Sequence, residues 1–182
     1  PAARSDVSVP NEFTMRRTAT LALFLLLMLG PLSTRAQSEA EAIPVHGDFA
    51  GLVDIGGLSL YLECHGSGGP TVVLISGCRA SAMYWTDDLL QSGAPRSMVL
   101  QGLDKVTRVC TYDRPGTVAS IDDEDYISRS DPISQPRTAP EVVAELHALF
   151  KAAGMPGPYV LVGHSLGGLF ARLYASTYPG EV

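Results

Sequence analysis

Apolar residues along this chain fall either into short uninterrupted runs or into longer stretches with helical spacing. Residues 71–75 (TVVLI) are mostly apolar and β-branched without alternation, which is typical of a strand buried on both faces. Two apolar runs on either side of Gly56-Gly57 predict a hairpin. The strands predicted in this way are 49–55, 58–64, 71–75, 106–112 and 159–162.

Helical spacing follows in two later stretches. Thr138 and Glu141 form a capping-box pattern at the start of the first, and Gly154 with Pro156 ends it. The second begins after Ser165 and stops at Pro179-Gly180. The apolar positions that share a face are Val142, Leu146, Leu149, Phe150 and Ala153 in one helix, and Leu166, Leu169, Phe170, Leu173 and Tyr174 in the other. Alternating buried strands and amphipathic helices predict an α/β fold with a mostly parallel sheet.

The segment between the strands and the first of these helices has a different composition. Residues 113–140 carry four prolines and many acidic side chains, which predicts an exposed connection. Its run Asp122-Asp123-Glu124-Asp125 lacks the spacing of a calcium loop, so we interpret it as a solvated acidic stretch and expect no metal there.

The N-terminal region has the pattern of a targeting segment. Met15-Arg16-Arg17 is basic, residues 18–29 are almost all apolar, and Thr34-Arg35-Ala36 offers small residues for cleavage. The apolar run is shorter than the ~20 residues of a membrane-spanning helix. We predict a secretory signal peptide cut after Ala36, and the alternative is an uncleaved membrane anchor. The predicted parts are a non-native upstream segment (1–14), the signal peptide (15–36) and an exported domain (37–182), secreted or in the periplasm or cell envelope.

Composition and charge narrow the class of protein. The 182 residues suffice for one domain, and 46% of them are hydrophobic, which favours a packed globular protein. A net charge of −6 argues against nucleic acid or an anionic membrane surface as a partner. Three cysteines in an oxidising compartment permit one disulfide and leave one thiol, and none of their spacings resembles a zinc site. We expect no cofactor.

One short stretch carries candidate chemistry. Residues 160–170 (VLVGHSLGGLF) place Ser165 between Gly163 and Gly167, at the junction of a predicted strand and a predicted helix. Such a G-x-S-x-G turn holds a serine hydroxyl exposed in a strained backbone that needs small neighbours. The pattern alone arises by chance in on the order of one chain in ten of this length. Its position between a strand and a helix makes Ser165 a candidate nucleophile.

A loop earlier in the chain fits the same chemistry. Ser76-Gly77-Cys78-Arg79 directly follows the strand 71–75. In an elbow enzyme this loop supplies one oxyanion N–H, and the residue after the nucleophile supplies the other. The candidate donors are therefore the backbone amides of Cys78 and Leu166. Nearby, Tyr84 and Trp85 could line a substrate pocket or belong to the core.

These motifs together resemble the N-terminal half of an α/β-hydrolase-fold protein. The matching stretches are TVVLISGCRA, RVCTYDRPG and YVLVGHSLGGLFARLYASTYPGEV, within about residues 50–182. They are most similar to secreted or envelope-associated bacterial hydrolases of the esterase or lipase type. Two departures stand out: Ser76-Gly77 replaces the family's usual His-Gly, and Gly116-Thr117-Val118-Ala119-Ser120 replaces a Gly-x-Gly-x-Ser run.

The resemblance has consequences for the cysteines and for the catalytic partners. The family's sheet order would set Cys64 beside Cys110, which is compatible with a disulfide; the alternative is two buried thiols. Cys78 has no base that would make it a nucleophile. In the family the acid and then the histidine follow the serine, so we expect both after Val182 and expect these residues, a fragment, to be inactive and poorly folded alone. We predict that no histidine present is the base: His46, His65, His147 and His164.

The function that this reading favours is a serine hydrolase acting on ester or related acyl substrates, either small molecules or lipid-like ones. Ser165 would attack the substrate carbonyl while backbone amides hold the oxyanion. Two kinds of alternative remain open. One is another enzyme on the same fold, for acyl transfer, haloperoxidation or C–C bond hydrolysis, and the other is an exported binding protein without catalysis.

Overall fold

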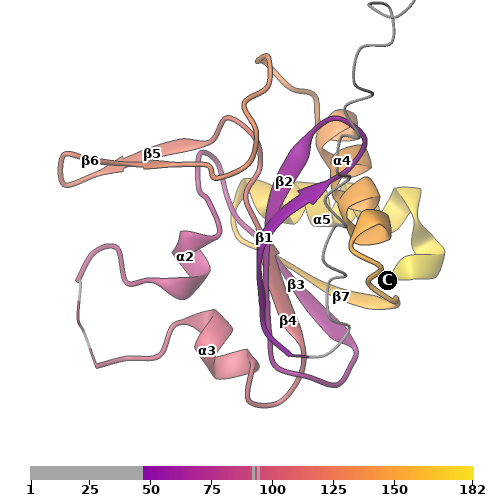
Figure 1. Cartoon of the computed structure of the whole chain (residues 1–182), viewed down its shortest axis with the longest axis horizontal. Coiled ribbons are helices and arrows are strands. Elements are labelled where there is room, and N and C mark those ends of the chain that lie inside the picture. Colours follow the sequence, from indigo (N-terminus) through magenta and orange to yellow (C-terminus); the bar gives the residue numbers. More distant parts are fainter. Residues whose placement is uncertain (1–46, 92, 94) are drawn as a thin grey trace, which may run out of the picture. The chain divides into compact units, whose positions relative to one another are not determined.

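A five-stranded sheet organises the chain in a computed structural model that describes residues 47–182 except 92 and 94 (Figure 1). Its strand order is β1-β2-β4-β3-β7. The strands are β1 (Phe49–Asp54), β2 (Ser59–His65), β3 (Thr71–Ile75), β4 (Val109–Tyr112) and β7 (Tyr159–Gly163). The hairpin β1-β2 joins β4 antiparallel, whereas β3 runs parallel to both β4 and β7. The predicted α/β class and the predicted hairpin are confirmed.

Both faces of the central strand β3 are covered. Val73 and Ile75 belong to a large apolar cluster shared with the helices α4 (Ala139–Ala152) and α5 (Leu166–Thr177). Val72 and Leu74 point to the opposite face, where a smaller cluster includes Leu100. That face carries the short helices α2 (Met83–Thr86) and α3 (Val99–Leu103), which the sequence reading did not predict (Figure 1). The unbroken apolar pattern of β3 therefore reflects burial on both sides.

The start of α4 shows why the helix begins where predicted. The Glu141 carboxylate accepts hydrogen bonds from the backbone N–H of Thr138 at 2.8 Å and from its hydroxyl at 2.7 Å. The backbone N–H of Thr138 is the main reason that the pKa of Glu141 is lowered. Gly154 follows the helix with a φ of +60°, a conformation that favours glycine. Both predicted helices are confirmed.

A disulfide joins the hairpin to the parallel part of the sheet. Cys64 of β2 lies directly opposite Cys110 of β4, with 4.1 Å between their Cα atoms. Both side chains are fully buried. Cys78 is the free cysteine of the described residues, and it is exposed.

Three boundaries differ from prediction. The strand expected over 106–112 starts only at Val109, because the chain turns after α3 and leaves Val106 exposed. The strand β7 is not buried on both faces: it pairs with β3 alone in the described sheet, and Val160 and Val162 are exposed. The segment 113–140 is not simply an exposed connection, since it contains the hairpin β5 (Val118–Ile121) and β6 (Glu124–Ile127), and the turn that precedes the hairpin is buried.

Several predictions fall on other parts of the chain. The signal peptide, its cleavage after Ala36, the upstream segment and His46 lie outside the described residues. Within the described residues, no helix is long and apolar enough to cross a membrane. The chain closes with a short 3-10 helix, η1 (Pro179–Glu181), after α5.

Candidate active site

Ser165 lies in a strained turn between β7 and α5. Its backbone has a φ of +53° and a ψ of −124°, which side-chain-bearing residues seldom adopt. The turn is fixed to the sheet because the N–H of His164 donates to the Ile75 carbonyl at 3.0 Å. The N–H of Gly167 then donates to the His164 carbonyl at 2.9 Å, which starts the helix without an intervening loop. The predicted strand-to-helix elbow is therefore present.

The two glycines of the motif are required by space. A Cβ atom on Gly163 would lie 2.5 Å from the carbonyl carbon of Gly167, across the turn. A Cβ atom on Gly167 would lie 2.8 Å from the carbonyl oxygen of Ser76 and closer still to that of Ile75. Real Cβ atoms do not approach backbone atoms so closely. The helix behind Ser165 thus packs directly on the end of β3.

The loop after β3 lies against this turn, as predicted. A Cβ atom on Gly77 would lie 3.1 Å from the Cβ of Ser165 and 3.0 Å from Nδ1 of His164. The loop is closed on itself by the Ser76 hydroxyl, which donates to the carbonyl of Ser81 at 2.8 Å. The structure therefore brings Ser76-Gly77-Cys78 and Ser165 together from segments almost ninety residues apart in the sequence.

A buried arginine holds that loop from behind. The Arg114 guanidinium donates to the carbonyl of Ser76 at 2.5 Å and also to the carbonyl of Gly77. Its charged carbon lies 5.2 Å from the centre of the Phe170 ring on α5. Arg114 is 7% exposed. Arg114 lies within the family-like stretch RVCTYDRPG, but the sequence pattern alone indicated no role for it.

The neighbouring aspartate holds the other end of the same loop. Asp113 is fully buried, and its carboxylate accepts the backbone N–H of Ala82 at 2.7 Å. The same carboxylate accepts the side chain of Arg129 at 2.8 Å. The turn after β4 therefore fixes residues 76–82 at both ends. The signal in the sequence that could have revealed this support is two consecutive charged residues, Asp113 and Arg114, directly after an apolar strand.

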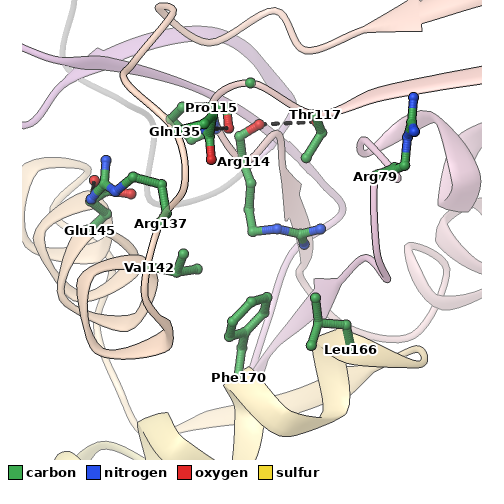
Figure 2. Close-up of a pocket in the computed structure, with 11 residues that line it drawn as sticks. Arg79, Arg114, Pro115, Thr117, Gln135, Arg137, Val142, Glu145, Leu166 and Phe170 are labelled. Atoms are coloured by element: carbon green, nitrogen blue, oxygen red, sulfur yellow. Dashed lines mark hydrogen bonds and ion pairs between the residues drawn. The ribbon is translucent and has the colours of Figure 1, made fainter.

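A pocket lies between the turn after β4 and the helices α4 and α5, next to the loop after β3 (Figure 2). Its volume is about 210 Å³. Leu166 and Phe170 line it from α5, and Arg114 lines it from the turn. On its far side, Arg137 forms an ion pair with Glu145.

A second, more open pocket lies between the loop after β3 and the strand β5. Cys78 and Tyr84 line this space of about 360 Å³ together with Ala119 and Ser120 of β5. Trp85 instead packs against the apolar cluster around Val72 on the sheet. Of the two aromatic residues considered for a substrate pocket, Tyr84 lines this pocket and Trp85 packs against the core.

No histidine among residues 47–182 is hydrogen-bonded to Ser165. His164 lies near the loop after β3, with its ring edge-on to Trp85 at a centroid distance of 6.4 Å. His65 is the last residue of β2 and lies 3.0 Å from the Glu63 carboxylate. These positions agree with the expectation that neither histidine is the base.

His147 of α4 is half-buried against residues that follow α5. Its ring stacks on Tyr178 with centroids 3.9 Å apart, and its Nδ1 lies 3.2 Å from the Glu181 carboxylate. Lys151 also pairs with Glu181 at 2.8 Å, and this ion pair is the main reason that the pKa of Glu181 falls to about 2. These contacts join α4 to the C-cap of α5 and to η1.

The part of the chain that the structure describes contains no set of side chains that could bind a metal ion. No group of three histidine, cysteine or acidic side chains is placed to hold an ion there. The acidic run Asp122-Asp123-Glu124-Asp125 forms the exposed tip of the β5-β6 hairpin.

Comparisons with known proteins agree with this geometry. Residues 70–182 match the model of the alpha/beta hydrolase fold. A relative from Escherichia coli named "Putative carbamate hydrolase RutD" is 33% identical over 113 residues, which cover 62% of this chain and 35% of that protein. The structure of lip1, a "putative lipase" from Acinetobacter baumannii AYE, is 28% identical with a TM-score of 0.56, over 75% of this chain and 39% of that one. A bromoperoxidase from Bacillus anthracis is 26% identical with a TM-score of 0.53, over 71% and 40%.

The relatives and solved structures that match this chain carry names of different activities. This chain spans 24% to 35% of the length of the first curated relatives that it matches. The family model covers the loop after β3, the turn after β4 and the whole strand–elbow–helix unit. The chain belongs to the alpha/beta hydrolase fold family.

Proposed function

We propose that this protein is a serine hydrolase that cleaves esters or related acyl compounds, with Ser165 as its nucleophile. The observation that carries the proposal is the backbone of Ser165, held at a φ of +53° between two glycines that permit no side chain. A strained residue persists only where its surroundings determine it, and such residues concentrate at functional sites. Elbow geometry exposes the hydroxyl at the carboxyl end of the sheet, where a substrate can reach it.

The reaction begins with attack of the Ser165 hydroxyl oxygen on the substrate carbonyl carbon. Its proton passes to a base, and the carbonyl π electrons move to oxygen, which becomes an oxyanion. When the oxyanion collapses, the bond to the leaving group breaks and the leaving group takes the proton. Water then attacks the acyl-enzyme in the same manner and releases the acid. We assign the base to a histidine after Val182 in the full-length protein, oriented by an acidic residue that also follows Ser165.

Two backbone amides are proposed to hold the oxyanion. The N–H of Leu166 is at the first position of α5, where helical geometry provides no acceptor. The N–H of Cys78 is in the loop that contacts the Ser165 turn, and it makes no hydrogen bond among the described residues. Fixed donors of this kind need no reorganisation as charge develops. The positive end of α5 adds to the same effect.

The substrate class rests on the chemistry of the site and of its relatives. A hydroxyl nucleophile with an oxyanion site acts on carbonyl carbons that carry a leaving group, as in esters and carbamates. The similar proteins include one named "Putative carbamate hydrolase RutD" and one named a "putative lipase", and carbamates and lipid esters both carry such a carbon. We propose an acyl substrate of small-molecule or lipid-like type.

The decisive experiment replaces the nucleophile in the full-length protein. Ser165→Ala should lower turnover of an aryl ester by at least about 10⁴-fold and abolish labelling by a fluorophosphonate, without loss of folding. Ser176→Ala is the matched control, because Ser176 is an exposed serine on the same helix whose hydroxyl only donates to the Leu173 carbonyl. Fluorophosphonate labelling that persists in Ser165→Ala would exclude Ser165 as the nucleophile.

We also propose that the protein is exported. The basic and apolar pattern of residues 15–36 predicts a secretory signal. The Cys64–Cys110 disulfide supports this proposal, because such bonds form and persist in oxidising compartments.

A further inference from the structure

The Arg114 guanidinium contacts one particular peptide group of the active-site loop. It donates to the carbonyl oxygen of Gly77, and the N–H at the other end of that same peptide plane belongs to Cys78. The other terminal nitrogen of the guanidinium donates to the carbonyl of Ser76, which belongs to the preceding peptide plane. One side chain thus fixes the orientation of two consecutive peptide planes.

A cation on a peptide oxygen changes the N–H of the same peptide. It draws electron density toward the carbonyl, which makes the N–H a stronger donor, because hydrogen bonds in a chain polarise one another by roughly 10–30%. It also prevents the plane from rotating, so the N–H keeps its direction before any oxyanion forms. Both effects are directed at Cys78, the proposed oxyanion donor.

We propose that Arg114 is a positioning residue that orients and polarises the Gly77–Cys78 peptide for oxyanion binding. The inference rests on the proposed function, because it assumes that the Cys78 N–H meets a developing charge. Arg114 makes no hydrogen bond to Ser165 among the described residues, so its proposed effect on the oxyanion passes through the loop after β3.

The surroundings of Arg114 support a role beyond packing. Burial of a guanidinium is costly unless charge or hydrogen bonds compensate it. No ion pair of the described residues includes Arg114. Its guanidinium donates to the two loop carbonyls and lies over the Phe170 ring, and its charge also acts on the buried Tyr112 hydroxyl. Its charge is therefore directed at the two loop peptides rather than neutralised by a carboxylate. Figure 2 shows the side chain reaching from the turn after β4 toward Phe170 and Leu166 of α5.

The shape of arginine matters for this role. Two carbonyls on consecutive peptides require two parallel N–H donors in a fixed fork, which the planar guanidinium provides. A lysine would place one ammonium group among the same oxygens, without the fork. Arg114→Lys therefore keeps the charge and loses the geometry, whereas Arg114→Met keeps most of the volume and loses both.

The experiment compares these variants in the full-length protein, with Arg137→Met as a matched control. Arg137 lines the same pocket and is also largely buried, but it pairs with Glu145 and makes no hydrogen bond or ion pair with the loop after β3 among the described residues. For each variant we measure kcat and KM for an aryl ester, normalised to sites labelled by a fluorophosphonate at completion. We also measure the affinity for a trifluoromethyl ketone, which forms a tetrahedral oxyanion on the serine.

Arg114→Met should lower kcat per labelled site by on the order of 10–100-fold, below the ~10²–10³ lost with a whole oxyanion donor. KM should change by less than about threefold, and ketone affinity should fall by the same factor as kcat. Arg114→Lys should recover part of the loss, and guanidinium ions added to Arg114→Ala should recover part of it too. Arg137→Met should lower the melting temperature while its kcat stays within about twofold.

Two outcomes separate this inference from the proposed function. If the wild-type protein shows no turnover and no labelling of Ser165, the proposed function and this inference both fail. If wild-type labelling and turnover are present but Arg114→Met and Arg114→Lys keep wild-type kcat and ketone affinity per labelled site, the positioning role alone is overturned. Arg114 would then act only in stability, as a lower melting temperature with unchanged kcat would show.

Discussion

The sharpest structural test of the elbow is a comparison of two adjacent glycines, Gly167 and Gly168. Both are near the start of α5, and both would gain one methyl group on substitution by alanine. At Gly167 that methyl carbon would meet the carbonyl oxygens of Ile75 and Ser76, where β3 ends. At Gly168 its nearest neighbour is the Gly163 carbonyl oxygen at 3.7 Å, an ordinary contact.

The two substitutions should therefore have opposite signs. Overpacking a closely packed site costs about 1–3 kcal/mol and sometimes more. We expect Gly167→Ala at the upper end, because backbone carbonyls of a central strand cannot rotate away as a side chain would. Gly168→Ala removes a glycine from a helix without a clash, which stabilises by up to about 1 kcal/mol. The two variants should differ by about 3–4 kcal/mol in the free energy of unfolding.

Urea denaturation of the full-length variants measures this difference, and the rate of fluorophosphonate labelling reports on the site. Gly167→Ala should also label more slowly, because any relief of the clash moves α5 and with it Ser165. Gly168→Ala should label at the wild-type rate. Equal stability of the two variants would refute the close packing of α5 on β3, and with it the spatial reason for the second glycine of the motif.

Two further predictions concern the oxidised, exported form. Reduction of the Cys64–Cys110 bond, 46 residues apart in sequence, should lower the free energy of unfolding by up to about 4 kcal/mol, and identical urea midpoints for oxidised and reduced protein would contradict it. In a secreting host the mature chain should begin at or near Gln37 by N-terminal sequencing, whereas a cytoplasmic protein that retains Met15 would contradict export.

Much of the fold could be predicted because local patterns and tertiary burial agree. The run TVVLI predicts β3, and both of its faces are covered. The Thr138 and Glu141 pair predicts the start of α4, which forms as a capping box. Where tertiary position decides, the pattern misleads: β7 has the same apolar character as β3, yet it lies at the edge of the described sheet and its valines are exposed.

The short elements could not be predicted for a different reason. The helices α2 and α3 have four and five residues, too few to show a hydrophobic period. The β5-β6 hairpin lies in a segment that we interpreted as an exposed connection because of its prolines and charges. Its turn carries Asp122 and Asp123 at positive φ, which aspartate tolerates better than most residues, and the acidic run concealed this signal.

The site itself shows what a linear motif contains and what it leaves out. The turn at Ser165 could be predicted because its structural requirements are local in sequence: a turn, two glycines and a serine. The support of the loop after β3 was not readable, since Asp113 and Arg114 act on residues more than thirty positions earlier in the chain. The strand order explains why the turn after β4, the loop after β3 and Ser165 lie together. The strands β4, β3 and β7 are parallel neighbours, so their carboxyl ends lie at one edge of the sheet. These three neighbouring strands therefore place the Asp113-Arg114 turn, the loop with the proposed oxyanion donor and Ser165 side by side. A substitution in the turn after β4 should affect the Ser165 site through the loop after β3, which lies between them.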